Sequence, residues 1–153
     1  MKKIIIFALL CMMSAAFVFA QQPFVFENWS RWGNGLRVTP RGNTVTFNGD
    51  LASAAGLVNA RLSVNALRNR TVILEIQNAE ASNFGQDKMI KITMGNGDLT
   101  VMPRNVEYLI DNEYVPSHYT RLEIDIPRNF DGKLGFVFYK AELHGLVITA
   151  TIE

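Results

Sequence analysis

Apolar residues recur at every second position through most of the chain after residue 22. The clearest case is TRLEIDI at residues 120–126, where threonine, leucine and isoleucine alternate with arginine, glutamate and aspartate. Successive side chains of a β-strand point to opposite faces, so this segment has one apolar and one charged face. The pattern predicts a strand with one side in a core and the other in water.

The same alternation predicts further strands, with turn-forming Gly, Asn, Asp or Pro between them. They lie around residues 45–47, 72–76, 90–94, 134–138 and 146–152, and the predicted turns are Pro40–Asn43, Asn96-Gly97 and Asp131-Gly132. Gly56 interrupts the alanine-rich segment 51–62, which we therefore interpret as a loop that leads into a strand. About nine strands without a clear helix predict an all-β fold, an antiparallel two-sheet sandwich.

The first 20 residues have the build of a secretory signal peptide. Lys2 and Lys3 precede an apolar run, and small residues precede Gln21. Cleavage after Ala20 would leave residues 21–153 as one domain. We therefore expect an exported protein, in the periplasm, on the cell surface or outside the cell. The only cysteine, Cys11, lies in this segment, so the domain is expected to have no disulfide.

The charge balance argues against nucleic acid as a partner, and the apolar pattern argues against a membrane span. The 15 basic and 14 acidic residues give a formal net charge of +1, and two of the positive charges belong to the predicted signal segment. No basic field is therefore available for nucleic acid. No second apolar run approaches the roughly 20 residues that a membrane span needs.

The C-terminal part resembles a known family. The segment YVPSHYTRLEIDIPRNFDGKLGFVFYKAELHGLVITATIE contains a strand that ends in Pro, an Asp-Gly turn, an aromatic strand and a closing strand led by the short step Leu143-His-Gly-Leu146. This order is similar to the end of jelly-roll carbohydrate-binding modules, and the upstream segments RNRTVILEIQNAEASNF and KMIKITMGNG fit the same layout. The resemblance implies a jelly-roll sandwich, with carbohydrate as the partner.

The only two tryptophans, Trp29 and Trp32, are the first candidates for contacts with a sugar ring. Sugars pack their C–H faces on exposed aromatic rings while polar side chains bind the hydroxyl groups. In one unbroken strand over 24–32, Phe24, Phe26 and Trp32 would share a face and Trp29 would point the other way. A break near Gly33 would remove that orientation, and both rings could then belong to the core. Trp32 is the better ligand candidate because the adjacent Gly33 permits close approach.

The segment around Pro116 supplies a second group of candidates. Tyr114 and Tyr119 lie in a predicted loop, where binding residues are common, and Arg121 and Glu123 share the polar face of the following strand. The aromatic side chains would stack on a sugar and the charged pair would bind its hydroxyl groups. The alternative is that the tyrosines are ordinary rim residues and that the charged row is a solvated strand face.

The segment EIDI at 123–126 is also similar to the start of the active-site strand in jelly-roll beta-glucanases. Those enzymes use a first Glu as nucleophile and a second Glu, shortly after it, as acid and base, with the carboxyl groups about 5 Å apart. Here Pro127 and Arg128 stand where the second Glu should be. We therefore predict no enzyme. An enzyme would need a second carboxylate from elsewhere, such as Glu107 or Glu142.

No other motif indicates catalysis or a tightly bound cofactor. The two histidines, His118 and His144, have no metal-ligand spacing. Structural calcium is frequent in the jelly-roll modules, and the carboxylates that could hold it are Glu27, Asp50 and Asp131. The sequence thus predicts an exported domain that binds carbohydrate without catalysis. The alternative is a structural or adhesive protein of the cell envelope that binds protein partners, which predicts buried tryptophans and a broad, flat apolar surface.

Overall fold

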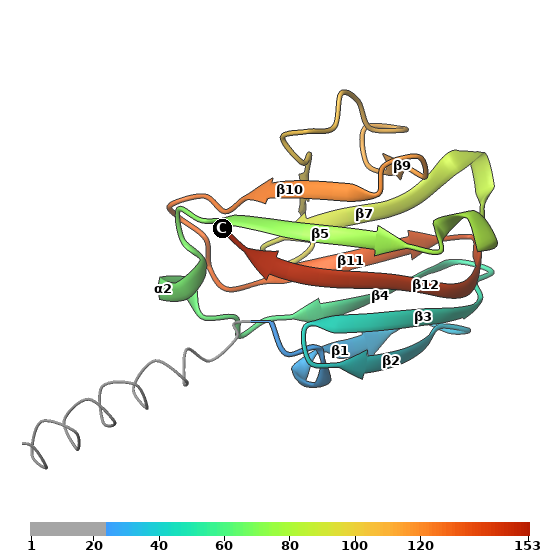
Figure 1. The fold of residues 1–153 in the computed structure, drawn as a ribbon, viewed down its shortest axis with the longest axis horizontal. Helices are drawn as coiled ribbons and strands as arrows, with labels where there is room; N and C mark the ends of the chain where they lie inside the picture. Colours follow the sequence, from blue (N-terminus) through green and yellow to red (C-terminus); the bar gives the residue numbers. More distant parts are fainter. Residues whose placement is uncertain (1–23) are drawn as a thin grey trace, which may run out of the picture.

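The computed structural model describes residues 24–153, so the predicted signal peptide lies outside the described residues. Twelve strands form two six-stranded antiparallel sheets, which pack face to face as a sandwich (Figure 1). This confirms the predicted all-β, two-sheet fold. The chain passes from one sheet to the other at most connections, which is the winding of a jelly roll.

The first sheet, sheet A, has the order β1-β4-β11-β7-β8, and β9 pairs with β7. Its strands are β1 (Ser30–Trp32), β4 (Ala54–Asn59), β7 (Lys88–Met94), β8 (Leu99–Val101), β9 (Val115–Pro116) and β11 (Leu134–Tyr139). The second sheet, sheet B, has the order β10-β5-β12-β3-β2, and β6 pairs with β12. Its strands are β2 (Arg37–Arg41), β3 (Thr44–Asp50), β5 (Thr71–Gln77), β6 (Asn83–Phe84), β10 (Arg121–Asp125) and β12 (Ala141–Ile152).

The core lies between the two sheets and is built from the inward positions of the alternating strands. Leu122 and Ile124 are fully buried, whereas Arg121, Glu123 and Asp125 face outward, as the alternation predicts. Aromatic rings join the layers: Phe47 of sheet B lies edge-on to Phe138 of sheet A, with ring centroids 4.9 Å apart.

Four of the strands, β1, β6, β8 and β9, have only two or three residues, which is too short for a visible alternation. The other eight strands compare with about nine predicted from the sequence. The predicted loop and strand at 51–62 is confirmed by β4. A short helix, α2 (Val64–Leu67), was not expected. It begins at Ser63, whose hydroxyl accepts the N–H of Ala66 as an N-cap.

Three single-turn 3₁₀ helices complete the fold: η1 (Phe26–Asn28), η2 (Ala79–Ala81) and η3 (Gly85–Asp87). The predicted hairpin at Asn96-Gly97 connects β7 and β8 through residues 95–98. Within residues 24–153, no helix is both long and apolar enough to cross a membrane.

Candidate functional site

The two tryptophans lie on opposite sides of sheet A. Trp29 is 7% exposed and packs in the core, where its ring stacks on Phe136 with centroids 5.2 Å apart. Trp32 is 41% exposed on the outer face of the sheet. The ring of Trp29 lies on the core side of sheet A, away from Trp32, so Trp29, predicted as a ligand-binding residue, does not belong to the candidate site.

The local fold explains why alternation along residues 24–32 does not predict which face each tryptophan ring occupies. The turn η1 interrupts the segment 24–32, so Phe24, Phe26 and Trp29 all reach the core together. The strand β1 begins at Ser30, after that turn, and Trp32 has the opposite orientation from Trp29 across an odd separation. The condition of one unbroken strand over 24–32 is therefore not met, and Trp32 is exposed while Trp29 lies in the core with the two phenylalanines.

Two glycines shape the outer face of sheet A beside Trp32. Gly56 lies directly opposite Trp32 in the register of β1 and β4. A Cβ atom on Gly56 would lie 2.9 Å from the indole Nε1 of Trp32, so the ring lies directly over the glycine. Gly135 of β11 is similar, because a Cβ there would lie 2.6 Å from the hydroxyl oxygen of Thr93. The missing side chains leave a hollow across the sheet.

This hollow is a cavity of about 480 Å³, which we call the Trp32 groove. Trp32 forms one wall and Tyr114 lines the opposite side, while β4, β11 and β7 form the floor. The floor residues that matter below are Val58, Thr93, Gly135 and Val137. The volume lies within the range of roughly 300–1,000 Å³ that is typical of ligand sites.

Tyr114 is held in place by a cluster of aromatic and cationic side chains. Its ring centroid lies 6.3 Å from that of Tyr139, and the Lys88 ammonium lies 5.9 Å and 5.7 Å from the two ring centroids. Lys88 is fixed in turn by an ion pair of 2.6 Å with Asp111. Burial raises the pKa of the Tyr114 phenol, so the hydroxyl group stays protonated at neutral pH and can donate a hydrogen bond.

The groove also contains polar groups of the kind that bind sugar hydroxyls. Lys91 donates to Glu113 at 2.8 Å, and Lys133 donates to the Asn96 side-chain oxygen at 2.6 Å. Both lysines, Asn96 and Thr93 line the cavity. An ammonium has three donor hydrogens, so each lysine retains donors after making one bond. The groove therefore offers an aromatic surface with hydrogen-bonding groups on its other sides.

The remaining predicted residues lie elsewhere. Arg121 and Glu123 are on the outer face of sheet B, on the opposite side of the sandwich, where Arg121 also pairs with Glu75 at 2.5 Å. Tyr119 packs partly against the core, and its phenol oxygen accepts the N–H of Glu107. None of these three lines the Trp32 groove, so they do not form one site with Trp32 and Tyr114.

Glu123 also differs from a catalytic carboxylate in its surroundings. Its oxygens accept from Arg104 at 2.6 Å and from Arg121 at 3.2 Å, and these hydrogen bonds, that of Arg104 first, hold the pKa of Glu123 below its ordinary value. Glu142, a candidate second carboxylate, lies at the start of β12 opposite Asp50. Glu123 lies on β10, which pairs with β5. Strand β5 pairs with β12 only from Val147 onward, five residues after Glu142, so Glu142 does not lie in the part of β12 that is next to β5.

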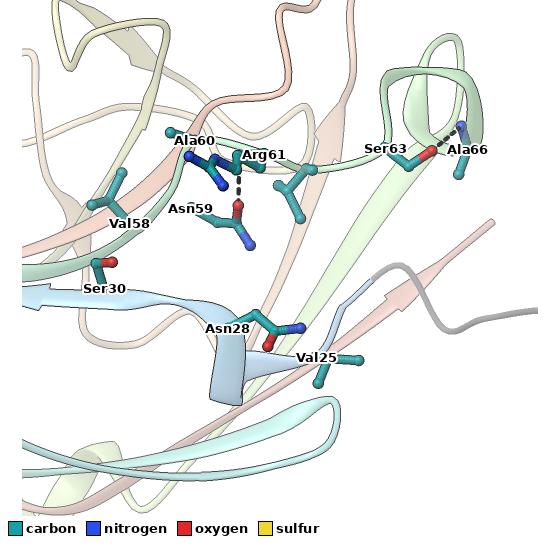
Figure 2. A pocket seen from close by; sticks show the side chains of 10 residues that line it. Val25, Asn28, Ser30, Val58, Asn59, Ala60, Arg61, Ser63 and Ala66 are labelled. Atoms are coloured by element: carbon teal, nitrogen blue, oxygen red, sulfur yellow. Dashed lines mark hydrogen bonds between the residues drawn. The ribbon is translucent and has the colours of Figure 1, made fainter.

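A larger cavity of about 790 Å³ lies beside the groove and shares Val58 and Ala60 with it. Figure 2 shows Val25 and Asn28 on one side of this cavity and Asn59 and Arg61 on the other. The Asn59 side-chain oxygen already accepts the backbone N–H of Arg61 at 2.7 Å. Among residues 24–153, no aromatic side chain lines this cavity, so they give it no surface for stacking, and we place the candidate site in the smaller groove.

The three carboxylates considered for calcium are separate in the fold. Glu27 accepts the backbone N–H of Gly42, Asp50 ends β3, and Asp131 accepts the N–H of Lys133. Within the described residues, no three His, Cys, Asp or Glu side chains come together as a set that could hold a metal ion.

Several groove residues were not predicted from the sequence, namely Lys91, Thr93, Asn96, Lys133 and Gly135, and neither was Gly56, which lies beneath the Trp32 ring. Lys91 and Thr93 occupy the polar positions of an alternating strand, a pattern that is equally typical of a solvated face. The glycines gave a better signal, because glycine inside a strand indicates the close approach of another group.

No family model matches the chain, and no curated protein or solved structure is significantly similar to it. What the groove binds must therefore be inferred from its own geometry and chemistry.

Proposed function

We propose that the protein binds carbohydrate in the Trp32 groove, without catalysis, after export from the cytoplasm. The observation that carries this proposal is Trp32 itself. A large aromatic ring that is 41% exposed, lies over a glycine and forms the wall of a groove suits the C–H face of a sugar ring. The nearby lysines, Asn96 and Thr93 would bind hydroxyl groups.

The position of the groove supports binding to a chain rather than to a single enclosed sugar. It crosses the outer face of sheet A from β1 to β7, and the adjoining cavity extends it past Val58 and Ala60. A polysaccharide could lie along such a surface, with one sugar unit on Trp32.

The proposal that the protein is not an enzyme rests on Glu123. Glu123 stands where the nucleophile would, but both of its oxygens are hydrogen-bonded to arginines, and it lines neither the Trp32 groove nor the adjoining cavity. Asp125, which shares its strand face, accepts from Thr71 and lies 3.4 Å from Arg104.

Affinity electrophoresis would test the proposed function. The protein would be run through native gels cast with soluble xylan, mixed-linkage β-glucan, galactomannan, pectin or alginate. Retardation in at least one gel is expected, and Trp32→Ala should weaken binding about fivefold or more, since an aromatic contact of this type contributes about 1 kcal/mol or more.

Tyr108→Ala provides a matched control for this experiment. Tyr108 is 53% exposed, like Trp32 an exposed aromatic, but it does not line the groove. Its replacement should leave retardation unchanged. Equal losses in the two variants, or no retardation in any gel, would contradict carbohydrate binding in the groove.

A second function, binding of a protein partner, is favoured by a different observation. Leu99, Met102 and Tyr108 are each about half exposed, Leu99 in the edge strand β8 of sheet A and the other two in the segment that follows it. Exposed large apolar side chains that lie close together are typical of protein contact surfaces. This candidate predicts self-association or partner binding that Leu99→Lys weakens and Trp32→Ala does not, as analytical ultracentrifugation would measure.

A further inference from the structure

A third cavity, of about 380 Å³, lies where the two sheets meet at one edge of the sandwich. Strand β1 is an edge of sheet A and β2 is an edge of sheet B, and both run along the same side of the molecule (Figure 1). The apolar side chains that line the cavity are Phe26, Trp29, Val38, Pro40 and Leu57. We call this cavity the edge pocket. It lies on the core side of β1, opposite the Trp32 groove.

Arginine side chains supply positive charge at the edge pocket. Arg31 precedes Trp32 in β1 and therefore points to the other face of the strand, toward the gap between the sheets. One of its nitrogens donates to the carbonyl of Leu36 at 2.5 Å. A guanidinium has five N–H groups, so most of its donors remain after this bond. Arg37, at the start of β2, also lines the pocket.

The indole N–H of Trp29 is a further donor at this place. Trp29 lines the edge pocket and is 7% exposed, and its Nε1 has no hydrogen-bond partner among the described residues. A buried N–H without an acceptor is costly, and such groups are rare in folded proteins. The nitrogen itself is fully buried, so an acceptor oxygen in the pocket would reach it only after a small shift of the neighbouring side chains.

The one carboxylate that lines the pocket is already engaged. Glu27 accepts the backbone N–H of Gly42 at 2.7 Å, in the turn between β2 and β3, and this bond is the largest cause that lowers the pKa of Glu27. The pocket lining thus contains two guanidinium groups and one carboxylate, which gives it a net positive charge. Guanidinium forks match the geometry of carboxylate and phosphate groups.

The geometry points to the edge pocket as a binding site for an organic anion, in which a carboxylate or phosphate group is carried on an apolar body. The anionic group would accept hydrogen bonds from Arg31 and Arg37 and would lie beside the ring of Trp29. The apolar body would lie against Phe26, Val38 and Leu57. This site is independent of carbohydrate binding, because it uses the opposite face of β1.

The indole resonances of the protein provide the test. The chain has two tryptophans, so a ¹⁵N-labelled sample, expressed from the full-length sequence, gives two indole N–H signals, and Trp32→Phe identifies that of Trp29. The probes would be benzoate, phenyl phosphate and inorganic phosphate, with uncharged benzamide as the matched control at constant ionic strength. We expect a saturable shift of the Trp29 signal with benzoate or phenyl phosphate, and not with benzamide.

Variants then assign the anion contact. Arg31→Gln should raise the dissociation constant about tenfold or more, because it removes a charged donor. Arg37→Gln should also raise the dissociation constant, but by less than Arg31→Gln does. Arg41→Gln is the matched control, since Arg41 belongs to the same strand as Arg37 and does not line the pocket. The titration of the unchanged protein remains a valid test even if an arginine variant unfolds.

Each other outcome contradicts a stated part of the inference. Equal shifts with benzamide would mean an apolar pocket without anion recognition. Equal binding of inorganic phosphate and phenyl phosphate would exclude a role for the apolar body. A Trp29 signal that no probe shifts saturably, or that responds equally in the Arg31→Gln and Arg41→Gln proteins, would exclude the site. A shift confined to the Trp32 signal would place the anion in the groove and overturn the assignment.

Discussion

At the scale of single residues, Trp29 belongs to the core, whereas Trp32 lies on the surface and is the residue that we propose for binding. They lie three positions apart, and the turn η1 sets the first ring in the core while β1 places the second on the surface. Their burial differs accordingly, at 7% and 41% exposed. Replacement of each should therefore affect a different property of the protein.

We expect Trp29→Ala to lower the free energy of unfolding by about 3–5 kcal/mol, because a large core side chain is lost and a cavity remains. Trp32→Ala should cost about 1 kcal/mol or less, as is usual for a partly exposed position. Urea denaturation of the two variants would measure both values. A larger loss of stability for Trp32→Ala than for Trp29→Ala would contradict the assignment of core and surface.

The hollow floor of the Trp32 groove leads to a second prediction at this scale. A Cβ atom on Gly135 would lie 2.6 Å from the hydroxyl oxygen of Thr93, which is itself 6% exposed. Gly135→Ala should therefore cost about 1–3 kcal/mol through overpacking. In a Thr93→Ala background the same change should cost markedly less, because the clashing oxygen is absent.

A double-mutant cycle measured by urea denaturation would give the coupling energy between positions 135 and 93. We expect the double variant to be more stable than the sum of the two single effects predicts, by at least about 0.5 kcal/mol. Additive effects of Gly135→Ala and Thr93→Ala would mean that the two side chains do not compete for the same space.

At the scale of elements, the free edge of β10 is covered by the segment that follows β8. Asn105 accepts the backbone N–H of Glu123 and donates to the carbonyl of Arg121, and the backbone N–H of Arg104 donates to the carbonyl of Glu123. An uncovered edge is a template for pairing with another chain, so this cover protects sheet B from association. The ion pairs of Arg104 with Glu123 and Asp125 add to the same contact.

The edge contact gives the stability of the fold a pH dependence. Hydrogen bonds from Arg104 and then Arg121 lower the pKa of Glu123 in the folded protein from its ordinary value of 4.5. A carboxylate with a lowered pKa stabilises the fold above pH 4.5, and this contribution is lost as the pH falls through the folded pKa. Glu123→Gln should therefore destabilise the protein at neutral pH.

The difference between wild type and Glu123→Gln should shrink as the pH falls from 4.5 through the lowered pKa of folded Glu123, below which the native side chain is also neutral. Urea midpoints measured between about pH 3 and pH 7 would show this convergence. Asp98→Asn is the control, because Asp98 is exposed in the turn between β7 and β8. A difference that stays constant across this range would mean that ionisation of Glu123 does not contribute.

At the scale of the whole molecule, the sequence predicted the layers but not the order of the strands. Alternation over residues 120–126 is local, and it correctly identified the buried and exposed faces of β10. The pairing of β3 with β12 joins segments about 100 residues apart, and no local pattern encodes that register. The candidate site depends on such pairings, since Trp32, Val58, Gly135 and Thr93 come from four strands of sheet A.

The same limit explains why the predicted site residues did not form one site. Arg121 and Glu123 follow Tyr114 closely in sequence, but the chain crosses from sheet A to sheet B between them. Closeness along the chain therefore placed on one surface residues that the sandwich separates by its full thickness. Aromatic type and adjacent glycine were better guides, because exposed rings and close approach are properties of single positions.

The topology also makes the last strand essential to the whole fold. Strand β12 lies in the centre of sheet B, where it pairs with β3 on one side and with β5 on the other (Figure 1). Without it, sheet B would split into a β2–β3 hairpin and a β5–β10 pair. The buried side chains that β12 contributes would also be lost: Leu143, Leu146, Ile148 and Ala150.

A chain that lacks residues 141–153 should therefore not fold. Neither half of sheet B can cover sheet A alone, and a two-layer core requires both layers. We expect loss of the near-ultraviolet circular dichroism signal and a red-shifted tryptophan emission, since Trp29 would leave the core. Adding the peptide of residues 141–153 should restore both signals, because its partners β3 and β5 are left unpaired. A cooperative unfolding transition in the shortened chain alone would show that sheet A and the remaining hairpins suffice, and that β12 is an addition to the fold rather than its centre.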